Sequence, residues 1–436
     1  MLRASIVRNA EADSLRKWRI GYGADLVGAL NHDSYFVLQQ LFADFQYRAV
    51  RLSVGQKERP MELKNQRLSS GSMTLGVNAR PVPQVRLELP DFWAIPGTKH
   101  WLALKAHIAY GMYTDNRWQR HFTESTTNPY TANSFFHSKA GFLRIGNSDR
   151  FPLTLTGGLE MACQFGGEGW NLPPRLDDPN IANFNPHQKM TNGIKSFWNA
   201  FIPSGNDVND GEYKNVEGNQ VGSWHLRLDY HSKGWGVGVY AEHFFEDHSQ
   251  MFWQYPWKDM LYGVEARLPK NPVLSTLVYE HLRTTDQSGP IYHDGTSTFP
   301  DNIYGTDNYY HHHIYGAWQH AGFTMGTPLL PSPLYNQDGR IAPIDSRVKA
   351  HHIGFDGNPV PGVSYRILYT HEKAWGTYGA PRTDPAKGDY LLVEASYAPR
   401  MLKGLSVTAS YGQNWGTLFD ASKGFMIGVA YSGWIK

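Results

Sequence analysis

The stretch "FPLTLTGGLEMACQF" (residues 151–165) separates its side chains into two chemically different faces when it is extended as a β-strand. The mainly apolar face carries Leu153, Leu155, Gly157, Leu159, Met161, Cys163 and Phe165, and the mainly polar face carries Thr154, Thr156, Gly158, Glu160, Ala162 and Gln164. In a soluble antiparallel sheet the apolar face packs against a core. In an outer-membrane β-barrel the apolar face contacts lipid and the polar face lines the lumen. The rest of the sequence has to decide between these two arrangements.

The same alternation recurs along the chain. "HWLALKAHIAYGMY" (100–113) is long enough to cross a bilayer at a tilt, since about 9 to 11 residues suffice. Residues 224–242, 262–283 and 390–411 each predict two strands joined at Pro-, Gly- or Asn-containing turns, and 424–434 predicts a last strand. The pattern indicates about sixteen to eighteen antiparallel strands.

Short turns alternate with long segments that are rich in Gly, Asn, Asp and Trp. The long segments are 166–221, 284–308 and 327–345, and one short helix is expected within 192–203. Short periplasmic turns and long extracellular loops are typical of bacterial outer-membrane barrels. We therefore expect an all-β transmembrane barrel that forms one domain over 1–436. Jelly rolls, sandwiches and propellers also use alternating strands, so a soluble all-β protein remains the alternative.

Composition supports the barrel and excludes other classes. The 436 residues include 14% aromatic and 18% charged side chains, with 43 glycines. The mean hydropathy is -0.48, and no run of about eighteen apolar residues could span a membrane as a helix. A net charge of +2 and the lack of a dense Lys/Arg run do not predict nucleic-acid binding. Cys163 is the one cysteine, which excludes an internal disulfide.

Several long stretches resemble the Wzi-type capsule assembly proteins of Bacteroidetes. Among them are "FHSKAGFLRIGN" (136–147) and "RVKAHHIGF" (347–355). The others lie at 57–92, 95–118, 151–167, 218–230, 242–253 and 268–294. The resemblance implies a closed barrel of about eighteen strands in the outer membrane. It also implies a lectin-like surface role in holding capsular polysaccharide, rather than an enzyme.

The same resemblance leads to further expectations. Similar proteins begin with a secretion signal and additional strand-forming sequence, so we expect this chain to lack the signal and the first strands. The expected partners are capsular or related surface polysaccharide and outer-membrane lipid, and the protein is expected to be a monomer without a cofactor.

Aromatic side chains in the long segments are candidates for sugar contacts. The flat C–H faces of sugars pack on aromatic rings, while sugar hydroxyls need polar partners. The candidates are Trp170, Trp198, Trp253, Trp257, Tyr304, Tyr309 and Tyr310. Each of these rings could instead pack a loop onto the barrel or lie in the girdle of aromatic residues at the membrane interface.

Charged residues on the polar faces of the strands are expected to line the lumen. They are Glu160, Arg227, Asp229, Glu242, Glu265 and Arg267. Both signs are present, so these side chains are expected to brace the wall by pairing rather than to form a charge-selective pore.

The histidine-rich stretches do not predict a metal site. "HFFEDHSQ" (243–250) lacks the helical spacing of known zinc motifs, and "YYHHH" (309–313) places two histidines, His311 and His313, on one face of a strand. No nucleophile elbow, phosphate-binding loop or dinucleotide fingerprint is present. The competing functions are a porin-like saccharide channel and a soluble all-β enzyme acting on glycans.

Overall fold

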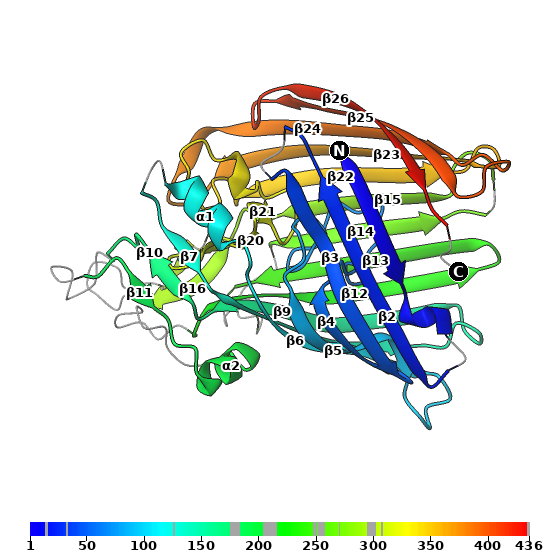
Figure 1. The fold of residues 1–436 in the computed structure, drawn as a ribbon, viewed down its shortest axis with the longest axis horizontal. Coiled ribbons are helices and arrows are strands. Elements are labelled where there is room, and N and C mark those ends of the chain that lie inside the picture. The colour runs from blue at the N-terminus through cyan, green and yellow to red at the C-terminus, as the bar shows by residue number, and fades with distance from the viewer. Residues whose placement is uncertain are drawn as a thin grey trace.

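The computed structural model describes residues 1–13, 16–31, 34–124, 127–174, 184–203, 216–246, 251, 258–269, 271–293, 302–306 and 308–433. Seventeen strands of this part form one large antiparallel sheet (Figure 1). They are β1 (Leu2–Arg8), β2 (Trp18–Gly28), β3 (Phe36–Tyr47), β4 (Val50–Gln56), β5 (Gln84–Ala94), β6 (Leu102–Met112), β8 (Phe135–Ile145), β9 (Leu153–Phe165), β12 (Asn219–Ser232), β13 (Trp235–Phe245), β14 (Met260–Arg267), β15 (Thr276–Arg283), β22 (Val348–Gly357), β23 (Val363–Gly376), β24 (Pro381–Tyr397), β25 (Leu405–Gly416) and β26 (Ser422–Tyr431). The prediction of an all-β fold with long antiparallel strands is confirmed.

Each strand of this sheet pairs with its neighbours in chain order, and the sheet curves around a lumen (Figure 1). Among the described residues, β1 pairs with β2 alone and β26 pairs with β25 alone. Because neighbours are antiparallel, the first and the seventeenth strand point the same way. Two such strands cannot pair as antiparallel neighbours, which is why barrels of this kind have an even number of strands. The described part thus has one strand fewer than the eighteen that the resemblance implies.

The strands are turned inside out relative to a soluble sheet. Leu226 on β12 and Val239 on β13 are 53% and 52% exposed on the outer surface. Their polar neighbours Arg227 and Glu242 face inward and are buried. On β9, Thr156 and Glu160 are likewise buried on the inner face, while Leu155 is exposed on the outer face. Apolar outer faces and polar inner faces are the arrangement of a membrane barrel.

The connections differ in length between the two ends of the sheet. At one end the strands are joined by short turns, such as residues 233–234 between β12 and β13. At the other end lie the long connections, which include 57–83, 166–218 and 284–347. By the rule for bacterial barrels, the short-turn end is periplasmic and the long-loop end is extracellular. The predicted alternation of short turns and long loops is confirmed.

The long connections carry small elements of their own at the extracellular end (Figure 1). The helices are α1 (Asn116–Thr123) and α2 (Ile194–Phe201), and the latter is the helix expected within 192–203. The short strands are β7 (Tyr130–Ala132), β10 (Glu168–Trp170), β11 (Gln188–Lys189), β16 (Ser288–His293), β17 (Asn302–Thr306), β18 (His311–His312), β19 (Gly316–Ala317), β20 (Gln319–His320) and β21 (Phe323–Thr324). No helix in the described ranges is both long and apolar enough to cross a membrane.

Two of the connections turn back into the lumen and supply its core. We call residues 57–83 and 308–347 together the plug. Met73 from the first segment and Trp318 from the second belong to one buried apolar cluster, which also contains Phe244 and Leu261. Phe244 and Leu261 come from the strands β13 and β14. The dry core of this protein therefore lies between the plug and the inner wall.

Candidate functional site

The inner wall holds the plug through carboxylates, and Glu242 is the most buried of them. Its Oε1 accepts hydrogen bonds from the Ser72 hydroxyl (2.9 Å) and the Met73 backbone N–H (2.8 Å). Its Oε2 forms a short ion pair with Lys64, whose ammonium also donates to the Gly71 carbonyl at 2.7 Å. Neither side chain of the pair is more than 1% exposed. Glu242 on β13 thus binds the first plug segment directly.

Glu265 on β14 forms a second anchor with a charged network. It accepts bonds from Arg227 at 2.9 Å and Arg267 at 3.0 Å, and Arg227 also contacts Asp229 at 2.8 Å. Arg227 in turn donates to the carbonyl of Leu63 in the plug at 3.0 Å. Four of the six charged residues expected in the lumen therefore form one network on neighbouring strands. Its positive and negative members pair with one another, and two of them also bind the plug, since Glu265 accepts a hydrogen bond from the Asn65 side chain at 3.2 Å.

Glu280 on β15 repeats the pattern one strand further along the sheet. It accepts bonds from the Ser69 hydroxyl (2.7 Å), the Ser70 N–H (2.5 Å) and the Tyr240 hydroxyl (2.6 Å). On β22, the His352 ring nitrogen Nε2 lies 2.8 Å from the Leu68 carbonyl. Carboxylates on three successive strands and one histidine on the next thus bind the same plug segment. The wall from β12 to β22 is therefore joined to this segment by hydrogen bonds and ion pairs. Glu280 was not among the residues predicted for the lumen.

Glu160, the sixth predicted lumen residue, lies deeper in the wall. It is buried on β9, 3.8 Å from His225, which lies at the same distance from Glu242. Glu160 also lines a cavity of about 430 Å³ between the plug and the wall. It is therefore part of the interior charge network, and its Oε2 has no hydrogen-bond partner among the described residues.

The two plug segments bind each other in the centre of the lumen. The Trp318 indole N–H donates to the Thr74 carbonyl at 2.8 Å, and the Gly76 N–H donates to the Met325 carbonyl at 2.7 Å. The Tyr310 hydroxyl donates to the Met73 carbonyl. These bonds join parts of the chain that are more than 230 residues apart. They make the plug one unit rather than two independent loops.

Tyr309 and Tyr310 were expected as exposed rings for sugar stacking, and the structure does not support that expectation. Both rings are at most 2% exposed, and both pack edge-on against Phe244. The Tyr309 hydroxyl contacts Asp259 at 3.3 Å. Both tyrosines follow a polar, loop-like stretch in the sequence, which gave no sign that this stretch turns inward. They fill the core of the plug and cannot face a polysaccharide.

Cavities follow the opposite side of the plug. The cavity of about 430 Å³ shares Arg80 with a pocket of about 490 Å³ at the extracellular end. It shares Pro60 and Glu62 with a cavity of about 520 Å³ that extends to the short-turn end. The first is lined by the plug and by strands from β5 to β9, and the extracellular pocket by the plug, β3, β4 and α1. The cavity at the short-turn end is lined by the plug and by strands from β5 to β9, and also by residues of β12 and β14. The lumen is therefore filled on one side and hollow on the other.

The extracellular pocket, which we call the mouth pocket, combines an aromatic ring with polar groups. Its lining residues are Ser34, Leu38, Gln56, Arg80, Thr114, Asp115, Arg117, Trp118, His121, His320 and Ala321. Trp118 lies on α1, is half-buried and stacks on Phe122 with ring centres 4.8 Å apart. Its other close neighbour is Gly322, where a Cβ would come within 2.6 Å of the indole. The ring is thus held in place by its own helix and by the plug.

Asp115 fixes α1 against the plug. Its carboxylate accepts bonds from the Ala321 N–H (2.9 Å) and the Gln319 side chain (3.0 Å). Next to it, His320 contacts the Arg80 carbonyl at 2.8 Å through Nδ1 and the Thr114 hydroxyl at 3.2 Å through Nε2. Burial lowers the pKa of His320 below its usual value, although the nearby Asp115 acts in the opposite direction. The neutral ring can donate through one nitrogen and accept through the other.

Trp118 was not among the sugar-binding candidates, although a signal for it exists. The segment "TDNRWQRHF" (114–122) carries aromatic side chains four residues apart, at Trp118 and Phe122, as on one face of a helix. No helix was predicted for this stretch, which directly follows the strand predicted at 100–113.

Trp170 lies in the small sheet of β7, β10 and β11. Its ring stacks on His187 with centres 3.6 Å apart and lies parallel to Tyr130 at 6.3 Å. Glu168 next to it contacts His187 at 3.2 Å and Lys189 at 3.3 Å. Aromatic and charged groups therefore meet on this extracellular sheet. The rings of His187 and Tyr130, however, lie against the Trp170 ring, where a sugar would have to stack.

Trp198 lies on α2, which packs on the outside of the barrel. Phe197 of the same helix contacts Phe135 and Phe165 on the outer faces of β8 and β9. Trp198 itself is 57% exposed, and Ile194 and Ile202, four residues away on each side, are also exposed. An apolar row on the outer surface is typical of a membrane interface. Trp198 is therefore poorly placed for a sugar that enters the mouth pocket.

The remaining candidates fall outside what can be described. Trp253 and Trp257 lie outside the described residues, as does His248, and of Tyr304 the strand β17 is described but the side chain is not. In the described ranges, no group of three or more His, Cys, Asp or Glu side chains is arranged to hold a metal ion.

The fold and its inverted polarity define the class: this is a bacterial outer-membrane β-barrel with a folded plug. Its fold is similar to that of Wzi from Escherichia coli, an outer-membrane protein described as involved in group 1 capsule assembly and as a carbohydrate-binding β-barrel. The two share 13% sequence identity over 98% of this chain and 77% of Wzi, with a TM-score of 0.59. This likeness shows the fold.

Two other outer-membrane structures match less well. OccK1 of Pseudomonas aeruginosa has a TM-score of 0.45, with 12% identity over 98% of this chain and 90% of its own. OmpT of Vibrio cholerae has a TM-score of 0.36, with 11% identity over 98% and 90%. No family model and no curated protein matches the sequence. The expected origin in Bacteroidetes is not supported by these comparisons.

Proposed function

We propose that this protein binds capsular or related surface polysaccharide at its extracellular end without catalysis, and so helps to retain the capsule. The single observation that carries this proposal is the mouth pocket, where Trp118 lies beside the plug among hydroxyl, amide and guanidinium groups. The similar fold of Wzi, which is described as a carbohydrate-binding barrel involved in capsule assembly, also supports this proposal.

The pocket offers the two kinds of contact that a sugar needs. The indole of Trp118 can pack against the C–H face of a sugar ring. Thr114 and Gln56 supply hydroxyl and amide groups for sugar hydroxyls, and the guanidinium groups of Arg80 and Arg117 suit the carboxylates of acidic sugars. The plug supplies Arg80, His320 and Ala321 to the pocket, so a chain bound here rests against the plug at the extracellular end.

Two tryptophans on similar helices provide a matched test. Trp118→Ala removes the ring in the mouth pocket, whereas Trp198→Ala removes an exposed ring from the outer surface. We expect W118A to weaken binding of purified capsular polysaccharide to the full chain in detergent about tenfold, and W198A to leave it within about twofold. Calorimetry or surface plasmon resonance measures both. Equal affinities of the two variants would contradict the proposal.

Capsule retention tests the same proposal in cells. In a deletion strain, the wild-type gene and W198A are expected to restore cell-attached capsule, and W118A to restore less of it. Immunoblotting of the outer-membrane fraction controls for the amount of each protein. Capsule that stays attached in the deletion strain itself would show that the protein is not needed for this role.

A narrow saccharide channel is the second candidate function, because three cavities that share lining residues follow one side of the plug. Single-channel recording in a planar bilayer distinguishes the two. Steady conductance that is reduced by oligosaccharide would favour the channel, and the absence of conductance would favour surface binding.

A further inference from the structure

The outer surface of four neighbouring strands carries a row of basic side chains near the extracellular end. In the register of the sheet, Arg283 on β15 is opposite Lys349 on β22, Lys349 is opposite Lys373 on β23, and Lys373 is opposite Lys387 on β24. We call these four residues the cationic row. They belong to the outward-facing set, because the residues that alternate with them, such as Ala350 and Ala374, are buried. The row therefore faces the surroundings of the barrel rather than its lumen.

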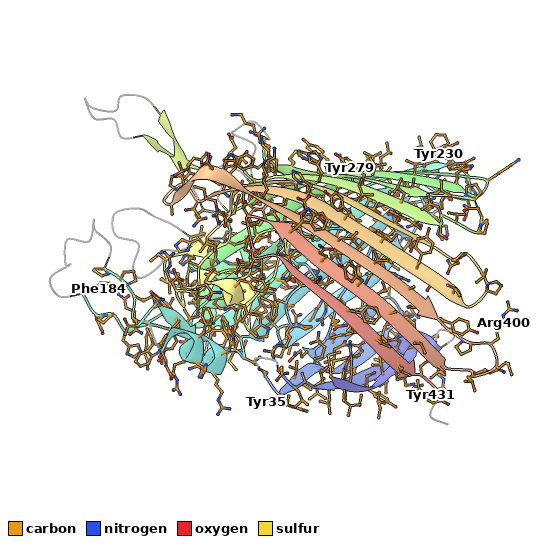
Figure 2. The ribbon with its side chains drawn as sticks, turned by 90° about the horizontal axis from the view of Figure 1, so that it is seen from above. Tyr35, Phe184, Tyr230, Tyr279, Arg400 and Tyr431 are labelled. Atoms are coloured by element: carbon orange, nitrogen blue, oxygen red, sulfur yellow. The ribbon has the colours of Figure 1, made fainter. Side chains whose placement is uncertain are left out.

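The rows below the cationic row show at which depth it lies. The next row towards the middle of the barrel consists of His281, His351, His371 and Asp389. The row after that consists of Tyr279, Ile353, Tyr369 and Leu391, and Figure 2 shows Tyr279 on the outer surface of the wall. Outward side chains thus change from apolar, through aromatic and imidazole, to cationic. This is the sequence expected where the lipid tails end and the headgroups of the outer leaflet begin.

The charges of the cationic row are only partly balanced by the protein in the part of the chain that the structure describes. Lys349, Lys373 and Lys387 have no carboxylate oxygen within 4.0 Å there, and Lys349 lies over the Trp375 ring at 5.5 Å. The nearby Asp389 is already bonded to the Tyr369 hydroxyl (2.6 Å) and to His371 (2.9 Å).

Like charges that stand directly opposite each other in a sheet are destabilising. Arg283 has only a long contact of 4.0 Å to Asp259 and a bond of 2.9 Å to the Thr285 hydroxyl. An external anion that touches several members of the row would offset their repulsion. A ligand with more than one negative group, placed at the depth of the lipid headgroups, would therefore stabilise this surface.

We propose that the cationic row binds the phosphate groups of a phosphorylated glycolipid of the outer leaflet. Lysine ammonium groups attract phosphate as point charges, and the arginine guanidinium can bind it with two parallel hydrogen bonds. Neighbouring strands are about 4.8 Å apart, so four strands spread the row over about 15 Å, which is wide enough for two phosphate groups. The proposal rests on the barrel and its depth in the membrane, and it is independent of sugar binding in the mouth pocket.

The test uses lipid A with two phosphates and the same lipid after enzymatic removal of both phosphates. Native mass spectrometry of the full chain in a neutral detergent counts the bound lipid across a titration. Wild-type protein is expected to bind the phosphorylated lipid about tenfold more tightly than the dephosphorylated one, and to lose this preference as the salt concentration rises. Equal binding of the two lipids would overturn the proposal without the need for any variant.

A charge-matched pair of variants locates the site. The triple change Lys349→Gln, Lys373→Gln and Lys387→Gln removes three cations from the row. The control Lys99→Gln, Lys233→Gln and Lys403→Gln removes three exposed cations from turns at the periplasmic end. The first is expected to weaken binding of the phosphorylated lipid about tenfold and the second less than about twofold. Equal affinities would place the lipid elsewhere and overturn the proposal.

Folding of the variants is checked by the faster electrophoretic migration of unheated barrels. If the triple variant fails this check, Lys373→Gln alone is compared with Lys233→Gln, and a preference for phosphorylated lipid that is unchanged between them would also overturn the proposal.

Discussion

The two sides of the lumen differ in how deeply their charges are buried where they meet the plug. From β12 to β22, Glu242, Glu265 and Glu280 each accept hydrogen bonds from the plug. From β3 to β6, Arg51 and Arg86 both pair with Glu88 inside the wall, at 2.8 Å and 2.6 Å. The ion pairs that join this side to the plug, Lys57–Asp44 and Lys105–Glu62, have cations that are 16% and 18% exposed, against 1% for Lys64. The first side holds a chain segment and the second leaves cavities beside it. Charge in this lumen is therefore structural where it meets the plug, and any passage or ligand site depends on the hollow side.

The largest effect is expected when one partner of the buried Glu242–Lys64 pair is removed, because this pair holds the plug on the filled side. Glu242→Gln leaves the Lys64 ammonium buried without a counter-charge, and such changes cost about 3–5 kcal/mol. We expect a loss of this size in the free energy of unfolding, measured by urea titration of the protein refolded in lipid vesicles. Conductance in planar bilayers is expected to rise as the plug loosens.

Two further variants support the interpretation of this first prediction. Glu58→Gln, at an exposed position, should leave stability within about 0.5 kcal/mol of wild type. The double variant Lys64→Met and Glu242→Gln should recover most of the loss, because it no longer buries a charge alone. If Glu242→Gln alone proves neutral, the plug is not held by this pair.

A smaller effect is expected at the crossing of the two plug segments. A Cβ on Gly326 would come within 2.1 Å of the Tyr310 hydroxyl and 2.4 Å of the Met73 carbonyl. Gly326→Ala should therefore push the segments apart and lower the unfolding free energy by about 1–3 kcal/mol. Gly412→Ala, where nothing lies within 4 Å of the added carbon, is the matched control and should be neutral. Similar unfolding curves for the two variants would show that the crossing tolerates extra volume.

The barrel could be predicted from the sequence because its signal is repeated on every strand. The alternation in 151–165 and in the hairpin of 224–242 depends on local side chains alone, and both are strands with the expected inner and outer faces. The helix within 192–203 was found for the same reason. Local periodicity does not show how strands at opposite ends of the chain meet, so the closure of the barrel could not be predicted from it.

The candidate site was harder to predict because its partners are far apart in the chain. Glu242 meets Lys64 across 178 residues, and Tyr310 meets Met73 across 237 residues. Polar, glycine-rich stretches such as 57–83 look like surface loops, although the polar groups in this one are satisfied by the wall. Tyr309 and Tyr310 were for that reason expected at the surface. Trp118 was not predicted because no helix was expected in 114–122, which directly follows the strand predicted at 100–113.

On the hollow side, replacing Arg59 of the plug is expected to leave the free energy of unfolding unchanged or to raise it. Burial and the neighbouring Arg86 lower the pKa of Arg59 to about 9. Its guanidinium donates to the Ser53 hydroxyl at 3.1 Å and the Lys57 carbonyl at 2.9 Å, while its Nε has no hydrogen-bond partner among the described residues. Arg59→Met should therefore be neutral or stabilise the protein by up to about 1 kcal/mol, as measured by the same urea titration. A clear loss of stability would show that the hollow side also needs its buried charge.

The smallest effect is expected from protonation of His320, where α1 meets the plug. Because its folded-state pKa is lowered below the unfolded value of about 6.5, the stability it contributes is present above that pH and is lost as the pH falls through the folded-state pKa. Hydrogen exchange of peptides covering 113–124 and 317–325 should therefore speed up between pH 7.5 and pH 5.5, after correction for the intrinsic rate. Asp115 opposes this shift, so the change should be modest and confined to these peptides. His320→Gln, which cannot titrate, should remove the pH dependence, and its persistence in that variant would assign it to another group.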